Sequence, residues 1–115
     1  SAENVFNNIP SWLGLAQTSQ AITADASSQV ANVTTAVTEI NATSATGAIS
    51  LADGSDGQIK IFINTSTSGT NNVVITPTNL RGGTTITLNA QGETAVCIFK
   101  NSNWNVIGGH GFVVA

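Results

Sequence analysis

Charged side chains are scarce in this sequence, and their scarcity excludes several classes of partner. The 115 residues include three Lys or Arg and six Asp or Glu, so only 8% are charged and the formal net charge is -3. Globular proteins carry about 25%. Three basic side chains neutralise few phosphates, so we expect no nucleic-acid partner. A polybasic contact with a membrane surface is excluded for the same reason, and no apolar run approaches the roughly 20 residues of a transmembrane helix.

Reactive side chains are equally few. The chain has one His, one Cys, no Tyr and no Met. His110 stands between glycines, and no Gly-x-Ser-x-Gly pattern supplies a nucleophile for it. Cys97 lies in an apolar run, where a free thiol is expected to be buried and unreactive. Asp53 and Asp56 resemble a fragment of a calcium loop but lack its remaining oxygen ligands. We therefore predict a protein that is not an enzyme and that has no cofactor and no metal.

Neutral polar residues take the place of charge. Ser, Thr and Asn make up 40 of the 115 residues. A small monomer normally carries more charge to stay soluble. We therefore expect part of this neutral surface to be covered by other copies of the chain.

From Gly47 onward the hydrophobic residues recur with a period of two, as in Ile59, Ile61 and Ile63. Segments rich in Gly, Asn, Asp and Ser separate these runs, at 53–57, 68–72, 81–83, 91–92, 101–103 and 108–109. Short β-rich runs with such turn signals predict a mainly β protein, with an antiparallel β-sandwich or barrel over about 47–115.

Two aromatic residues do not fit a simple inside–outside alternation. Phe62 and Phe99 are out of phase with their Ile and Val neighbours, which predicts strands that are buried on both faces. One face would pack within the subunit and the other against another copy, or both would belong to a second layer of the same chain. Arg81 is the single Arg, and it is either an interface residue or a solvated turn residue.

The first 46 residues differ from the rest and predict a separate N-terminal arm. Within 17–46 glycine is absent, and a heptad-like spacing of 4, 3, 4 and 3 joins Ala26, Val30, Val33, Val37 and Ile40. β-branched residues at both apolar positions of the heptad favour a three-stranded coiled coil. Three interpretations remain open, namely a short trimeric helical bundle, a helix packed on its own domain, and an extended Thr-rich segment. The predicted domains are an arm over 1–46, partly helical or extended, and a β domain over 47–115.

Large apolar side chains gather at the start of this arm. They either cover the chain's own core or dock onto a neighbouring molecule, for which aromatic residues supply large contact area. The predicted docking residues are Val5, Phe6, Ile9, Trp12, Leu13 and Leu15.

Three segments of the β half, 49–60, 74–87 and 103–111, carry a family resemblance. Together they resemble a β-rich module of structural proteins in tailed bacteriophages, especially phages of marine bacteria and cyanobacteria. The likeness covers about 47–115. The resemblance implies that the chain is a viral structural protein of the virion. Such modules occur in capsid decoration proteins, head fibres and tail fibres, typically as trimers. The resemblance implies no catalytic residue.

The expected function is a homotrimeric capsid decoration (cement) protein at the capsid surface, which clamps neighbouring subunits of the major capsid protein. We expect the 115-residue chain to be complete, with Met removed before Ser1, and this size favours a decoration protein because a tail fibre usually needs a longer shaft. The alternative is a short head- or tail-fibre component that recognises a host surface as a carbohydrate-binding module. The residues predicted at the interface between copies are Val30, Val33, Val37, Ile40, Phe62, Phe99 and Arg81.

Overall fold

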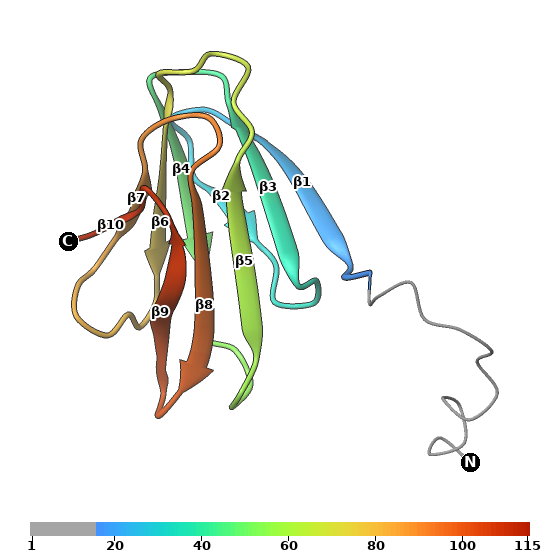
Figure 1. Ribbon diagram of the computed structural model, residues 1–115, viewed down its shortest axis with the longest axis vertical. Coiled ribbons are helices and arrows are strands. Elements are labelled where there is room, and N and C mark those ends of the chain that lie inside the picture. The colour runs from blue at the N-terminus through green and yellow to red at the C-terminus, as the bar shows by residue number, and fades with distance from the viewer. Residues whose placement is uncertain (1–15) are drawn as a thin grey trace, which may run out of the picture.

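The computed structural model of the chain describes residues 16–115, and these residues form an all-β fold without a helix (Figure 1). The strands are β1 (Ser19–Ala24), β2 (Gln29–Ala31), β3 (Val37–Ala42), β4 (Thr46–Leu51), β5 (Ile59–Asn64), β6 (Asn72–Pro77), β7 (Ile86–Leu88), β8 (Thr94–Lys100), β9 (Asn103–His110) and β10 (Val113–Val114).

The strands make two five-stranded sheets that pack face to face. Sheet A has the order β1-β3-β5-β8-β9, and sheet B has the order β10-β7-β6-β4-β2. From β1 to β6 the chain alternates between the two sheets. Each strand from β3 to β6 pairs in parallel with the strand two places before it in the sequence. The pairs β1–β2, β3–β4 and β5–β6 are therefore three stacked coils, an arrangement typical of β-solenoids.

The last four strands pair in the antiparallel sense. β7 adds to β6 and β10 adds to β7 in sheet B, while β8 adds to β5 and β9 adds to β8 in sheet A. The β8–β9 hairpin turns through Asn101 and Ser102, whose φ angles are 52° and 60°. Two consecutive positive φ values are the mark of the type I′ turn, whose twist matches that of the paired strands.

The core lies between the two sheets and is filled from alternate positions of the strands. Trp104 is its largest fully buried side chain, and its indole nitrogen donates a hydrogen bond to the Ala52 carbonyl at 2.9 Å. Phe99 packs edge-on against Trp104, with ring centroids 5.2 Å apart. Buried hydrophobic residues from both sheets complete the core, among them Ile40, Ile49, Leu51, Phe62, Val73, Ile75, Ile86 and Leu88.

The predicted mainly β architecture is confirmed, but the antiparallel pairing predicted for 47–115 is wrong where β4 pairs with β6 and β5 pairs with β3. The fold is two mixed sheets rather than a closed barrel. Alternation of apolar residues indicates which face of a strand is buried, but it does not indicate the direction of the neighbouring strand. Here each connection from β1 to β6 crosses to the opposite sheet, so successive strands in one sheet run in parallel.

The predicted division into an arm and a β domain at 46/47 does not describe this fold. β1, β2 and β3 all lie before residue 47, and they pair with strands from the second half in the same two sheets. The helical interpretation of the heptad is wrong, because Val30 lies in β2 and Val37 and Ile40 lie in β3. β-branched residues fit a pleated sheet better than a helix. The predicted docking residues between Val5 and Leu15 lie outside the described residues.

The β8–β9 turn offers a test of the hairpin geometry. Replacing Ser102 by Gly removes the steric cost of a side chain at positive φ. We expect S102G to increase the free energy of unfolding by about 0.5–1 kcal/mol, measured by urea denaturation at a fixed protein concentration. Ser68→Gly is the control, because Ser68 lies in a loop without positive φ and should gain nothing. Equal effects of both changes would contradict the assigned turn.

Candidate functional site

In β5, the central strand of sheet A, the isoleucines point outward and the residues that alternate with them point into the core. Lys60, Phe62 and Asn64 point into the molecule and are fully buried, whereas Ile59, Ile61 and Ile63 point outward. Phe62 sits in the core among residues of both sheets. The prediction that Phe62 contacts another copy is therefore wrong, and the outward isoleucines form the surface of interest.

Lys60 is buried without a carboxylate partner among residues 16–115. Its Nζ donates to the Thr35 carbonyl at 2.8 Å, lies 3.3 Å from the Thr35 hydroxyl and 3.4 Å from Asn32 Oδ1. It is also 5.9 Å from the centroid of the Phe62 ring. Burial removes water from the ammonium and lowers the pKa of Lys60 from 10.5 to about 8.

The Lys60 amine holds the connection between β2 and β3. Asn32 Oδ1 accepts hydrogen bonds from the backbone N–H groups of Thr34 and Thr35, at 3.3 and 3.1 Å, and from the Thr35 hydroxyl at 2.7 Å. An Asn side chain that caps its own loop in this way replaces a backbone turn. Lys60 thereby ties the third coil to the connection between the first two coils, which is a structural role.

A second buried polar group closes the other end of β5. Asn64 Nδ2 donates to the carbonyls of Asn71 and Leu88, at 3.1 and 3.0 Å. Its Oδ1 accepts from the backbone and the hydroxyl of Ser66, at 3.0 and 2.5 Å. Among the described residues every buried side-chain nitrogen and oxygen has a hydrogen-bond partner. Since satisfied polar groups cost little, Lys60 and Asn64 can both face inward.

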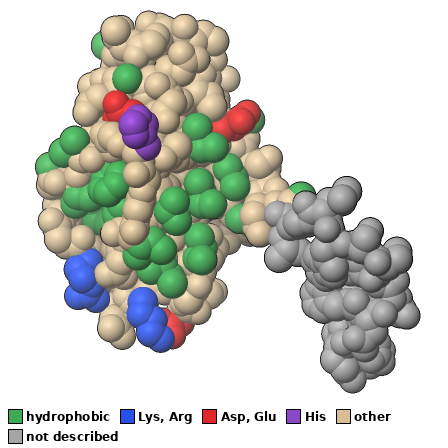
Figure 2. Space-filling view, viewed as in Figure 1, with side chains coloured by type: hydrophobic (Ala, Val, Ile, Leu, Met, Phe, Trp, Pro, Cys, Tyr) green, Lys and Arg blue, Asp and Glu red, His purple; other side chains and the backbone are tan. Residues whose placement is uncertain are grey.

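At the centre of the outer face of sheet A the outward side chains are aliphatic, and we call this cluster the apolar face; Glu39 and Lys100 point outward from the same sheet beside it. The strand register places Val37, Ile61 and Val96 side by side, and Ile59 beside Ile98. Hydrophobic side chains cover the middle of this face, with charged groups toward its rim (Figure 2). The apolar face consists of Val37, Ile59, Ile61, Ile63, Val96, Ile98 and Ile107.

Ile107 is the most exposed member of the apolar face, at 58%. A register shift opposite Val96 and Cys97 marks a β-bulge in the β8–β9 ladder, and Ile107 is the inserted residue. Its neighbour Val106 packs against the core, so Ile107 projects from the opposite, outer side.

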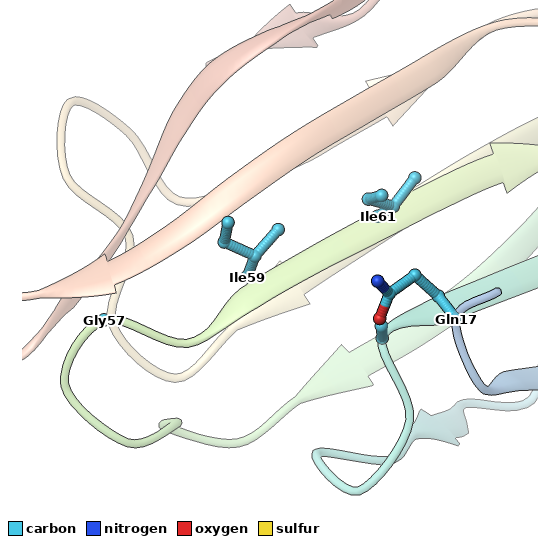
Figure 3. Close-up of a pocket in the computed structure, with 5 residues that line it drawn as sticks. Gln17, Gly57, Ile59 and Ile61 are labelled. Atoms are coloured by element: carbon cyan, nitrogen blue, oxygen red, sulfur yellow. The ribbon is translucent and has the colours of Figure 1, made fainter. Parts of the chain in front are cut away.

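A groove borders the apolar face on the side away from β9. It has a volume of about 450 Å³ and is lined by Gln17, Ala36, Gly57, Ile59 and Ile61. Figure 3 shows Ile59 and Ile61 standing on the same side of β5, with Gln17 across from them. Ile59 is 48% exposed, so an apolar group of a partner can reach it.

The outer face of sheet B is different in character. Its register places Ala48, Val74, Thr87 and Val113 in one row, and Val30, Ser50 and Thr76 in the next. Small and hydroxylated side chains dominate these rows, and none of their residues is an isoleucine. Val30 and Val113 are exposed on this face but stand beside Ser50 and Thr87, whereas the aliphatic residues of sheet A are direct neighbours in the register.

The residues predicted at an interface between copies are scattered in the structure. Ile40 and Phe99 belong to the core together with Phe62, so their assignment to an interface is wrong. Val33 packs against the core from outside, and Val30 is 64% exposed on the outer side of sheet B. Among the predicted interface residues, Val37 lies on the apolar face. Arg81 is exposed, and its Nε donates to Asn105 Oδ1 at 2.8 Å.

Sequence reasoning missed the apolar face because it assigned the wrong side of the strands to the core. Phe62 and Phe99 are the largest side chains of β5 and β8, and both point inward. Large aromatic side chains contribute most to a core, so their shared phase was the signal that could have marked the inner face.

The groups that could take part in chemistry are separated from one another. His110 is exposed at the end of β9, and its backbone N–H donates to the Thr94 hydroxyl. Cys97 is buried in β8, and burial raises the pKa of its thiol to about 12. Asp53 accepts hydrogen bonds from Asn79, and Asp56 forms an exposed ion pair with Lys100. Within residues 16–115 no three His, Cys, Asp or Glu side chains are grouped closely enough to hold a metal.

No protein-family model matches the chain, and no curated protein matches it in sequence. In the part of the chain that the structure describes, no helix has the length and hydrophobicity needed to span a membrane.

The buried amine and the buried thiol predict an unusual dependence of stability on pH. Between about pH 8 and 10.5 the unfolded state keeps a proton on Lys60 that the folded state has released, so stability rises with pH. Above pH 9 the unfolded state loses the Cys97 proton that the folded state keeps, and this lowers stability. We expect the free energy of unfolding, measured by denaturant titration at each pH, to rise by up to about 1 kcal/mol between pH 8 and 9. Above pH 9 the two effects oppose each other, and the free energy of unfolding should stay level.

Two variants separate these contributions. Cys97→Ala should extend the rise in stability to about pH 10.5, and Lys60→Met should abolish the rise between pH 8 and 9. A wild-type chain whose stability is flat between pH 8 and 9 would contradict the burial of Lys60 without a carboxylate partner.

Proposed function

We propose that the chain is a non-enzymatic structural protein of a virus particle, a capsid decoration (cement) protein that forms a homotrimer and clamps neighbouring major capsid subunits. The apolar face of sheet A is the observation that carries this proposal. The resemblance of 49–60, 74–87 and 103–111 to modules of tailed-phage structural proteins supports the viral setting.

The apolar face has the properties of a surface for assembly rather than for catalysis. Contiguous exposed hydrophobic surface marks an interaction site, and the central part of an interface is depleted in charge. Ile59, Ile61, Val96 and Ile98 place no charged group at the centre of the face. Covering it therefore removes hydrophobic surface from water without desolvating a charge.

The docking function falls to the N-terminal segment in this proposal. The side chains assigned to it are Val5, Phe6, Ile9, Trp12, Leu13 and Leu15. Each segment would bind a junction of major capsid subunits by burying apolar surface. Three linked segments on one trimer raise the effective concentration of the second and third contacts, so weak individual contacts suffice.

The three coils favour one second candidate, a short fibre component. β1 and β2 pair on one side only among the described residues, so that end of the solenoid presents two strand edges. Such edges allow further coils to stack, as in an elongated shaft. The carbohydrate-binding version has less support, because Trp104 is fully buried and cannot stack on a sugar.

The copy number of the protein separates the two candidates. We expect quantitative mass spectrometry of purified particles of the virus that encodes the chain to find it in hundreds of copies, because a decoration protein occupies repeated capsid sites. The major capsid protein in the same sample serves as the internal standard. A count of a few tens or fewer would overturn the decoration function and favour a fibre.

Deletion of residues 1–16 tests the docking segment. We expect the shortened chain to keep the fold, because β1 begins at Ser19, and to lose binding to undecorated capsids in a sedimentation assay. Far-UV circular dichroism checks the fold. Capsid binding by the shortened chain at wild-type strength would show that another surface docks.

A further inference from the structure

We infer that the apolar face is the surface on which three copies of this chain pack against one another, with Ile107 of one copy inserted in the groove beside Ile59 and Ile61 of the next. This inference deepens the proposed function, because it rests on the trimer proposed there and specifies its interface.

The outer face of sheet A carries a protrusion and a recess at different places. Ile107 protrudes from β9, at one edge of sheet A. The groove lies across the sheet, between β5 and the segments that contain Gln17 and Ala36. A protrusion and a recess on opposite sides of β8 cannot meet within one molecule, but they can meet between two copies.

The contact between Ile107 of one copy and the groove of the next is heterologous, because it joins two different surfaces. A surface that pairs with a different surface of the next copy forms a ring when the rotation between copies closes, whereas a two-fold contact pairs a patch with itself. Each copy in such a ring uses Ile107 toward one neighbour and the groove toward the other. All copies then bury both features, and the apolar faces turn toward a common axis.

The size of the apolar face limits the area that it can bury. Three strand spacings of about 4.8 Å, from β3 to β9, and a rise of about 3.3 Å per residue from Ile59 to Ile63 give a flat patch of roughly 14 by 13 Å. A stable interface buries about 800 Å² on each partner. The apolar face alone is therefore smaller than one stable interface, so the protruding Ile107, the groove and the residues around the face must add to the area that each copy buries.

The chemistry of the apolar face limits which partner can cover it. The centre of the face has no charge, so it specifies no charged ligand or oppositely charged protein. The charged groups closest in the strand register lie outside this centre: Glu39 faces the Ile63 end of β5, and Lys100 is already paired with Asp56 at 2.6 Å. A second copy is the occupant that supplies both a matching aliphatic surface and the protruding Ile107.

Light scattering after gel filtration of the full chain tests the interface. The wild type should elute with three times the chain mass of 11.7 kDa. Ile61→Lys and Ile107→Lys should each shift it to the monomer, because a buried unpaired ammonium is costly. Thr87→Lys on the outer face of sheet B is the matched control and should remain a trimer. Circular dichroism confirms that each variant is folded.

Crosslinking tests the specific pairing. In the variant with Ile107→Cys and Ala36→Cys, oxidation should give covalent trimers on non-reducing gels, because each copy is joined to two neighbours. Ala36→Cys with Thr87→Cys is the control and should give none. Covalent dimers without trimers would overturn the ring and indicate a two-fold contact.

The other outcomes also decide between explanations. A wild-type monomer at all concentrations, with aggregation after deletion of residues 1–16, would overturn the inference and assign the face to the chain's own N-terminal segment. Trimers that persist in Ile61→Lys and Ile107→Lys would overturn it as well. If the trimer forms through this face but virions lack the protein, the inference stands and the capsid function fails.

Discussion

The orientation of β5 is the constraint on which the rest of the structure depends. β5 is the central strand of sheet A, and it pairs in parallel with β3 on one side and antiparallel with β8 on the other. Phe62 fills the core, while Lys60 and Asn64 reach the loops at its two ends. Because strand residues alternate, these three inward side chains force Ile59, Ile61 and Ile63 to the outside.

This orientation exchanges the usual positions of polar and apolar groups. Burying Lys60 and Asn64 is tolerated because carbonyl oxygens and side-chain oxygens of neighbouring loops accept their hydrogen bonds. The same hydrogen bonds tie the loops between coils to the central strand. The outward isoleucines, of which Ile59 is exposed and Ile61 and Ile63 are half-buried, are the corresponding cost to a monomer in water, and the proposed association between copies would remove it.

Local features of this fold could be predicted from the sequence, and long-range ones could not. The alternating runs predicted strands after residue 47, the segment 101–103 predicted a turn, and Cys97 was predicted to be buried. The parallel coils were missed, because whether a connection returns to its own sheet or crosses to the other is not encoded in alternation. The apolar face was missed because Phe62 and Phe99 were assigned to an interface, and because the acceptor that lets Lys60 point inward, Thr35, is distant in sequence.

A crystal structure of the full chain would test most directly whether the orientation of β5 creates an assembly surface. We expect three copies around an axis, with Phe62 inside each subunit and with Ile61, Val96 and Ile98 covered by neighbouring copies. A structure in which the outer face of sheet A contacts only solvent, or only residues 1–15 of its own chain, would contradict it.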